Sequence, residues 1–262
     1  MLTSLPFRSL CIRGTRAGKI LTPNSSIVPT CFYSSAKQWS QRQKNDYFVK
    51  QAMTNNYRAR SAFKLIELND KHRFLRKGHI CVDCGASPGG WSQVASEKVC
   101  RKLRPLEKRE LSDGYVIAID LLPINPIPGV HILQKDFTEL STQNTIKNIL
   151  DKRKVHVVIS DMAPSFTGNH AVDHVRIMNL CESALGFAEI ILRKGGTFVC
   201  KFIMGGTERD FKLLLQSKFS KVYHEKPASS RKESTEGFFV CTGYLGQKKE
   251  PVEEYDDDID YN

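Results

Sequence analysis

The sequence predicts an α/β protein built on a doubly wound, mostly parallel sheet. The chief observation is that short runs rich in β-branched residues alternate with helix-like stretches along the chain. The length of 262 residues fits one domain of the larger α/β kind and is enough to bury a full core. Apolar residues at 40% and charged residues at 26% are globular values. No stretch approaches the ~20 apolar residues of a membrane span.

Seven runs are the predicted strands: 79–85, 115–120, 131–137, 155–161, 196–202, 221–226 and 237–245. Helices are predicted at about 57–70, 91–103, 141–152, 173–193 and 207–217. The last two strands follow each other without a helix between them. A parallel crossover would need a dozen or more residues there, so we expect the last strand to run antiparallel to the others. Residues 101–114 are predicted to be a charged surface insertion.

Eight cysteines are scattered along the chain without paired spacings, which indicates a reducing compartment rather than a disulfide framework. Cys81 and Cys84 form a Cys-x-x-Cys pair, but they lie in an apolar strand where alternation points them to opposite faces. No second pair completes a zinc site. We therefore expect core cysteines and no metal.

The two ends of the chain differ sharply in charge. Residues 1–45 hold seven Lys or Arg and no acid, with many Ser and Thr, whereas residues 250–262 hold seven acids and no base. The first composition is typical of an organelle transit peptide, and we expect one over residues 1–38. A basic arm that binds RNA is the alternative. Residues 247–262 are predicted to be an acidic, disordered tail.

The middle of the chain keeps the excess of positive charge. Subtracting both ends leaves 39 − 7 = 32 bases against 28 − 7 = 21 acids for residues 46–249. An excess of this sign suits a polyanionic partner, although it also serves ordinary solubility.

The first predicted strand ends in VDCGASPGGW, residues 82–91. Its glycines let the backbone pass close to a ligand and then open a helix whose first N–H groups are free donors. The pattern is neither Gly-x-Gly-x-x-Gly nor a P-loop, which favours a nucleoside ligand without a pyrophosphate. Asp120 ends the second strand, where an acid can accept both ribose hydroxyls. Asp136 ends the third and can accept from an adenine amino group.

Three further charged residues are expected at the same sheet edge. Asp161 ends the fourth strand, Lys201 nearly ends the fifth, and Glu236 begins the antiparallel last strand. Ligands of open α/β sheets bind beyond the carboxyl ends of the strands. An ammonium inside the apolar run VCKF costs several kcal/mol unless it is paired, and the two acids are suitable partners. A purely structural ion pair is the alternative.

These segments resemble the FtsJ-like ribosomal RNA ribose 2′-O-methyltransferases, most closely those of mitochondria. The matching motifs lie in order over roughly residues 45–246, the predicted methyltransferase domain: YRARSAFKL (57–65), VDCGASPGGWSQVA (82–95), IDLLPINPIPGV (119–130), QKDF (134–137), SDMAPSFTG (160–168), GGTFVCKF (195–202) and SRKESTEGFFV (230–240). The sequence departs from the family at Gly237, which replaces a β-branched residue, and at Phe238, which replaces a tyrosine.

The resemblance implies a Rossmann-like class I methyltransferase fold that binds S-adenosylmethionine. By residue, it implies that the methionine end and sugar lie against a turn composed of Gly85, Ala86, Pro88, Gly89, Gly90 and Trp91. It places Asp120 on the ribose, Asp136 near the adenine, and Asp161 among the cofactor-binding residues. It also implies a catalytic tetrad of Lys64, Asp161, Lys201 and Glu236.

The implied reaction is methyl transfer to a ribose hydroxyl, a poor acid that must be positioned and relieved of its proton. Lys201 can act as a neutral base or as a cation that stabilises the alkoxide, while the two acids hold it and Lys64 fixes the nucleotide. Transferases to exocyclic amines commonly carry Asn/Asp-Pro-Pro-aromatic, whereas this chain has Asp-Met-Ala-Pro. A hydroxyl acceptor fits better. Phosphates could bind a basic cluster formed by Arg58, Arg60, Lys64, Arg73, Arg76 and Lys77.

The expected protein is a mitochondrial matrix enzyme, an rRNA (uridine-2′-O-)-methyltransferase. Its expected partner is ribosomal RNA or a precursor of the large ribosomal subunit. Two alternatives remain open at this point. One is a methyltransferase for transfer RNA or the mRNA cap, and the other is a ribosome-assembly factor that keeps the fold without catalysis.

Overall fold

The computed structural model describes residues 46–102, 113–206 and 208–247. The predicted transit peptide, most of the predicted insertion at 101–114, and all but the first residue of the predicted acidic tail lie outside these ranges. Within them, no helix is both long and apolar enough to span a bilayer.

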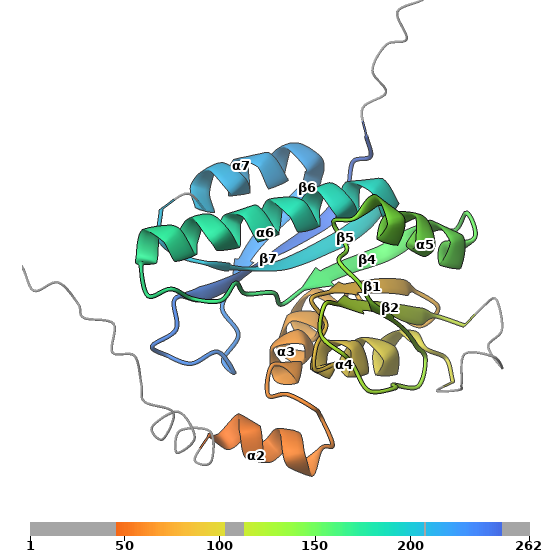
Figure 1. The fold of residues 1–262 in the computed structure, drawn as a ribbon, viewed down its shortest axis with the longest axis horizontal. Coiled ribbons are helices and arrows are strands. Elements are labelled where there is room, and N and C mark those ends of the chain that lie inside the picture. The colour runs from red at the N-terminus through yellow and green to blue at the C-terminus, as the bar shows by residue number, and fades with distance from the viewer. Residues whose placement is uncertain (1–45, 103–112, 207, 248–262) are drawn as a thin grey trace, which may run out of the picture. The chain divides into compact units, whose positions relative to one another are not determined.

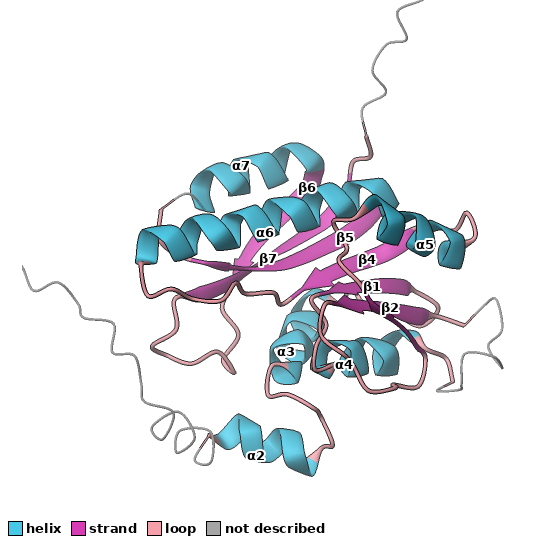
Figure 2. Cartoon of the chain, in the orientation of Figure 1, coloured by secondary structure: helices cyan, strands magenta, loops and turns pink. Residues whose placement is uncertain are grey.

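Seven strands form one sheet (Figures 1 and 2): β1 Ile80–Cys84, β2 Tyr115–Asp120, β3 Val130–Gln134, β4 Val155–Ser160, β5 Leu192–Ile203, β6 Phe219–Glu225 and β7 Glu236–Tyr244. Their order is β3-β2-β1-β4-β5-β7-β6. The neighbours from β3 to β5 pair in parallel, and β7 pairs antiparallel with both β5 and β6. The predicted fold class and the antiparallel last strand are confirmed.

Helices cover both faces of the sheet. One face carries α5 Leu140–Leu150, α6 His170–Ile191 and α7 Glu208–Lys218, and the other carries α3 Ala62–His72 and α4 Gly90–Val99 (Figure 1). Each face buries its own apolar cluster. Cys84 belongs to the first cluster and Cys81 to the second, so the predicted opposite orientation of the two thiols is confirmed. Burial raises the pKa of both thiols well above the ordinary value.

Helix α2, Tyr47–Thr54, was not among the predicted elements. It is one short stretch of mixed polarity, with Ala52 as its buried residue. The Asp46 carboxylate caps it by accepting the backbone N–H of Phe48 at 3.0 Å. The Phe48 ring packs on Phe63 of α3, with the ring centroids 5.5 Å apart. Tertiary packing, rather than its own periodicity, therefore stabilises this helix.

Several predicted boundaries are wrong: helix α4 ends at Val99 rather than about 103, and β5 begins at Leu192 rather than 196. Two others are wrong for a clear local reason. Helix α3 begins at Ala62 rather than about residue 57, because the Arg58 N–H donates to the Gln93 side chain at 2.8 Å, outside any helix. Strand β3 ends at Gln134 rather than at 137. Past it, the Asp136 carboxylate accepts from the N–H of Thr138 at 2.8 Å and from its hydroxyl at 2.7 Å, a turn that is incompatible with extended pairing. Similarly, Asp161 directly follows β4 rather than ending it.

Two histidines stack where β1 and β4 begin, with ring centroids 4.4 Å apart. The His156 Nδ1 atom accepts the Ile80 N–H at 3.1 Å. Burial, with smaller contributions from the charges of His79 and Arg193, lowers the pKa of His156 from 6.5 to about 4. The folded protein therefore holds this ring neutral. Burial likewise lowers the pKa of His79.

Acid is expected to destabilise the fold through His156. Because the folded pKa lies below the unfolded one, the contribution is complete above about pH 6.5 and is lost as the pH falls towards 4. Allowing for partial exposure, we expect a loss of about 1–2 kcal/mol over that window. Urea unfolding of His156→Asn, which keeps an acceptor for Ile80, measures it. Parallel pH profiles for the variant and the wild type would contradict the assignment.

Candidate active site

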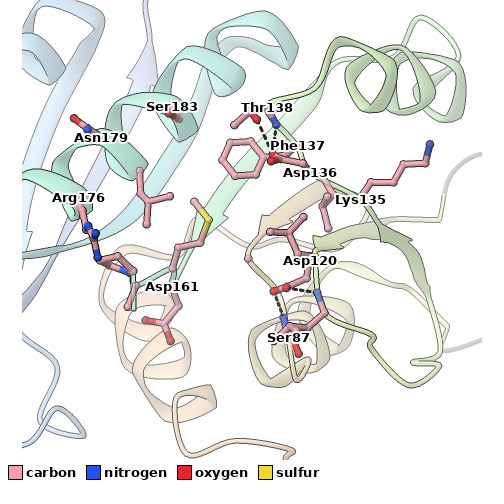
Figure 3. Close-up of a pocket in the computed structure, with 18 residues that line it drawn as sticks. Ser87, Asp120, Lys135, Asp136, Phe137, Thr138, Asp161, Arg176, Asn179 and Ser183 are labelled. Atoms are coloured by element: carbon pink, nitrogen blue, oxygen red, sulfur yellow. Dashed lines mark hydrogen bonds between the residues drawn. The ribbon is translucent and has the colours of Figure 1, made fainter. Parts of the chain in front are cut away.

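A cavity of about 660 Å³ lies beyond the carboxyl ends of β1, β2 and β4. Strand β1 lies between β2 and β4, and the chain order reverses at this point of the sheet, where open α/β folds bind ligands. Figure 3 shows Ser87 and Asp120 on one side of the cavity and Arg176 and Asn179 of α6 on the other. Its lining includes the carboxyl residues Asp120, Asp136 and Asp161 and the apolar residues Leu121, Leu122, Phe137 and Met162.

The glycine turn after β1 passes close to the loop after β4. Gly85 has a φ of +72°, and a Cβ there would lie 2.0 Å from the Cγ atom of Met162. Only glycine satisfies both the backbone angle and the close approach. The turn is fastened to β2, because the N–H groups of Gly85 and Ala86 both donate to the Ile119 carbonyl.

Only part of the predicted turn faces the cavity. Gly85 lines it, as does Ser87, but Ala86, Pro88, Gly89, Gly90 and Trp91 are not among the lining residues. Gly90 lies against the backbone of Ala59. The Trp91 ring is 3% exposed, and its Nε1–H donates to the Ser61 carbonyl at 2.8 Å. These residues support the turn and join it to the segment before α3.

The Asp120 carboxylate is held by the backbone at the cavity rim (Figure 3). It accepts the N–H of Ser87 and the N–H of Leu122, each at 2.8 Å. Two backbone donors fix its orientation, and a carboxylate retains further lone pairs for a ligand. Asp136 stands across the cavity on the turn that ends β3.

The four predicted tetrad residues come together as two ion pairs. Lys201 of β5 places Nζ 3.1 Å from Asp161 Oδ1 and donates to the Asp161 carbonyl at 2.5 Å. Lys64 of α3 places Nζ 2.7 Å from Glu236 Oε1 at the start of β7. All four side chains are between 11% and 16% exposed, so the charges are largely removed from water. Paired burial of this kind offsets the desolvation cost.

Glu236 is held ionised. Burial alone would raise its pKa, but the Lys64 ammonium, through its charge and hydrogen bond, and the nearby Lys201 outweigh that effect and leave the pKa below its ordinary value. Lys201 therefore contributes to the field at Glu236, which links the two pairs electrostatically. The departures at residues 237 and 238 fit this packing. A Cβ at Gly237 would lie 3.0 Å from the Phe202 ring, and Phe238 is buried against Trp91.

A second hollow, of about 250 Å³, opens beside the pair of Lys64 and Glu236. Its lining is strongly cationic: Arg60, Lys64, Arg231, Ser234 and Glu236. Asp46, which we did not predict as a site residue, pairs with the Arg60 guanidinium and lies 3.3 Å from that of Arg231. This acid joins segments 185 residues apart, so no local pattern in the sequence indicates its role.

Asp83 is a further group absent from the sequence prediction. It lies inside β1 with 1% exposure and accepts the Ser92 hydroxyl at 2.6 Å. Burial raises its pKa to about 7; the Ser92 hydrogen bond opposes this shift, and the charges of Asp161 and Asp120 add to it. The sequence feature that could have identified Asp83 is its position as an acid within an otherwise apolar predicted strand.

This sheet order, with a cavity at its reversal and acids at successive strand ends, defines a Rossmann-like α/β enzyme of the class I methyltransferase type. The sequence pattern of the FtsJ-like methyltransferases matches residues 57–244. The chain belongs to this family.

Curated relatives and solved structures agree with that membership. The chain is 40% identical over 243 residues to ribosomal RNA large subunit methyltransferase E of Sinorhizobium fredii, covering 93% of this chain and 95% of the relative. It is 46% identical over 212 residues to the protein of the same name from Ruegeria pomeroyi, covering 81% and 89%. A crystal structure described as a ribosomal RNA methyltransferase from Plasmodium falciparum superposes with a TM-score of 0.62 at 32% identity, covering 73% and 100%.

The cofactor is S-adenosylmethionine, and the cavity residues fit it. Three carboxyl groups and an apolar wall suit a cationic nucleoside, and the turn that would approach it contains no phosphate-binding lysine. The Asp161 Oδ1 atom is buried and accepts no hydrogen bond from the described residues, although Lys201 lies at ion-pair distance.

Proposed function

We propose that this protein methylates the ribose 2′-hydroxyl of a uridine in large-subunit ribosomal RNA. The observation that carries the proposal is that the tetrad contributes to two different hollows. The larger one, which suits a cationic nucleoside, includes Asp161, and the smaller cationic one includes Lys64 and Glu236. Lys201 pairs with Asp161, so in this proposal a methyl donor in the first hollow and an acceptor nucleotide in the second meet at the tetrad. The names of the curated relatives support ribosomal RNA as the substrate.

In this proposal the carboxylates of Asp120 and Asp136 bind the ribose and the adenine amino group of S-adenosylmethionine, beside the turn of Gly85 to Trp91. The bound cofactor supplies an electrophilic methyl group on a sulfonium. The Lys201 Nζ atom binds the attacking hydroxyl and either removes its proton or stabilises the oxyanion. Asp161 orients that amine, and the pair of Lys64 and Glu236 holds the nucleotide.

The acceptor is proposed to be a hydroxyl because the residues after β4 are Asp161-Met162-Ala163-Pro164. This segment lacks the Asn/Asp-Pro-Pro-aromatic turn common among transferases to exocyclic amines. The 2′-hydroxyl is also the group that distinguishes RNA from DNA.

The direct test is a map of ribose methylation in ribosomal RNA from cells with and without the protein, followed by rescue with wild type or Lys201→Ala. We expect one uridine of the large-subunit RNA to lose its methyl group and only the wild type to restore it. If Lys201→Ala restored the methyl group, the proposed chemistry would be wrong. If methylation stayed lost but subunit assembly recovered, a separate assembly role would be established.

Removing the Asp120 carboxylate is expected to weaken cofactor binding. In Asp120→Ala, the ribose loses its acceptor and the N–H groups of Ser87 and Leu122 lose theirs. We expect a 10- to 100-fold rise in the Kd for S-adenosylhomocysteine, consistent with about 1.5–3 kcal/mol for hydrogen bonds to a charged group. Calorimetry measures it, with Asp151→Ala as an exposed-acid control. An unchanged Kd would remove Asp120 from the proposed site.

We also propose that residues 1–38 direct the protein to the mitochondrial matrix, because their composition is that of a transit peptide. The alignment with the Sinorhizobium relative covers 93% of the chain and so reaches into this segment, which supports the alternative of an RNA-binding arm. A fusion of residues 1–45 to a fluorescent protein distinguishes a transit peptide from an RNA-binding arm. Import with cleavage supports a presequence, and a diffuse, uncleaved fusion argues against it.

A further inference from the structure

We propose that the edge of the sheet opposite the active site is a second RNA-binding surface, which contacts phosphates of the substrate away from the methylated nucleotide. The proposal rests on the RNA substrate proposed above. Strands β1, β2, β4 and β5 run parallel to one another and begin at this edge, so the segments that lead into them lie together there, with the first residues of β5. In Figure 1 the arrow of β4 points away from this edge of the sheet.

These lead-in segments are rich in cations. Their described parts hold ten Lys or Arg against two acids: Arg73, Arg76, Lys77, Arg101, Lys102, Lys152, Arg153, Lys154, Arg193 and Lys194, against Asp113 and Asp151. Asp113 is buried, so Asp151 is the exposed acid within these segments, and Asp70 at the end of α3 is the acid beside Arg73 and Arg76. Much of the positive excess of the folded chain therefore gathers on the edge away from the chemistry.

Some of these cations have structural roles. Lys77 donates to the carbonyls of Glu97 and Cys100, and Lys154 donates to that of Ile190, each at the end of a helix. Arg153 lies over the Tyr115 ring, 5.2 Å from its centroid. Such contacts complement helix dipoles and account for these three residues without any ligand.

Four others have no such role, and a fifth, Arg76, donates its Nε–H to the carbonyl of its neighbour Arg73 at 3.2 Å. Arg73, Arg76, Lys152, Arg193 and Lys194 are exposed, and none lies within ion-pair distance of an acid among the described residues. Unpaired exposed cations in a row are the groups that release counterions when they bind phosphates.

The cations form one continuous surface. The charge of Arg193 lowers the pKa of both stacked histidines, and that of Arg76 lowers the pKa of His79, so both arginines lie close to the stack. Two hollows lie among these cations. One, of about 590 Å³, includes Arg73 and Arg76, together with Asp70. The other, of about 130 Å³, includes Lys147 and Lys152. Concave cationic sites on either side suit the spaced phosphates of a folded RNA.

The surface is separated from the tetrad by the length of the sheet. Six residues of β4 span about 20 Å. RNA that reaches both edges must be folded around the protein or belong to a larger particle. The inference thus deepens the proposed function by naming the kind of substrate: structured RNA, held at two separate places.

The test compares two double variants of equal charge. Lys152→Gln with Lys194→Gln alters the proposed surface, and Lys212→Gln with Lys221→Gln alters lysines of α7 and β6 as a matched control. The probe is a folded transcript of large-subunit RNA that contains the methylated position, with binding measured at several salt concentrations. We expect the first pair to weaken binding about tenfold and to reduce the salt slope by about 1–2, since each phosphate contact contributes ~0.9. The control pair should change affinity less than about twofold.

Kinetics and a second probe complete the test. The first pair should raise KM for RNA and leave kcat at saturating RNA within about twofold, because no altered residue lies near the reacting atoms. The second probe is a vesicle of anionic lipid. Equal effects of the two pairs on RNA binding would overturn the inference. It would also be overturned if the first pair weakened binding to the vesicles and left binding to RNA unchanged. If the wild type methylated no RNA, the proposed function would be overturned instead. The binding comparison would then still show whether the surface binds RNA.

Discussion

Lys201→Ala is expected to lower the rate of methyl transfer by about 10²- to 10⁴-fold, the range that positioned proton-transfer groups contribute. The substitution removes the ammonium that pairs with Asp161 at 3.1 Å and that we propose binds the attacking hydroxyl. Binding of S-adenosylhomocysteine should change only a few-fold, because the carboxyl groups that line the cavity remain. Single-turnover transfer of a labelled methyl group to RNA, together with calorimetry of the cofactor product, measures both effects.

The arginine variant separates the two roles open to Lys201. A guanidinium keeps the positive charge but does not act as a proton acceptor. If Lys201→Arg retained full activity, an obligatory base would be excluded and electrostatic stabilisation favoured. If it were as inactive as the alanine variant, a proton-accepting amine would be favoured. Full activity of Lys201→Ala itself would overturn the active-site assignment.

Asp161→Asn is expected to impair both activity and stability. It leaves the Lys201 ammonium, 11% exposed, without its carboxylate. Breaking a fully buried pair costs about 3–5 kcal/mol, and we expect about 1–3 kcal/mol here because water reaches both groups. Activity should fall at least about 100-fold, because the amine loses the group that orients it. Urea unfolding and the same transfer assay measure the two effects.

The chain offers a matched control for this variant. Glu189 and Lys218 also form an ion pair, at 2.6 Å, but they are more exposed and far from the cavity. Glu189→Gln should cost less than about 1 kcal/mol and leave activity unchanged. If the two acid-to-amide changes were equally destabilising and equally active, Asp161 would have no special role at the site.

Local patterns were sufficient for much of this fold. Short runs rich in β-branched residues marked all seven strands, and the short connection before β7 predicted its antiparallel direction. The same reasoning gave the edge positions of Asp120, Lys201 and Glu236, because in a parallel sheet the direction of a strand decides the edge at which its ends lie. These predictions succeeded because each depends on a few neighbouring residues. Helix α2 was missed because its packing on α3 does not appear in its own sequence.

The sequence indicated that four charged residues come together, but not how they pair. The sequence and its family resemblance named Lys64, Asp161, Lys201 and Glu236, whereas only the structure joins Lys201 to Asp161 and Lys64 to Glu236. The roles of Asp46, which holds two arginines from distant segments, and of Asp83, whose pKa is raised by burial, depend on contacts across the fold.

By itself the sequence determined the class of fold, the family, and which charged side chains end up at the edge of the sheet, since backbone preference and strand direction are local properties. The tertiary structure alone decided the strand order, the insertion of β7 between β5 and β6, the two hollows lined by different tetrad residues, and the cationic opposite edge. The physical reason is that burial and Coulomb interactions depend on distances in space, which long-range packing sets.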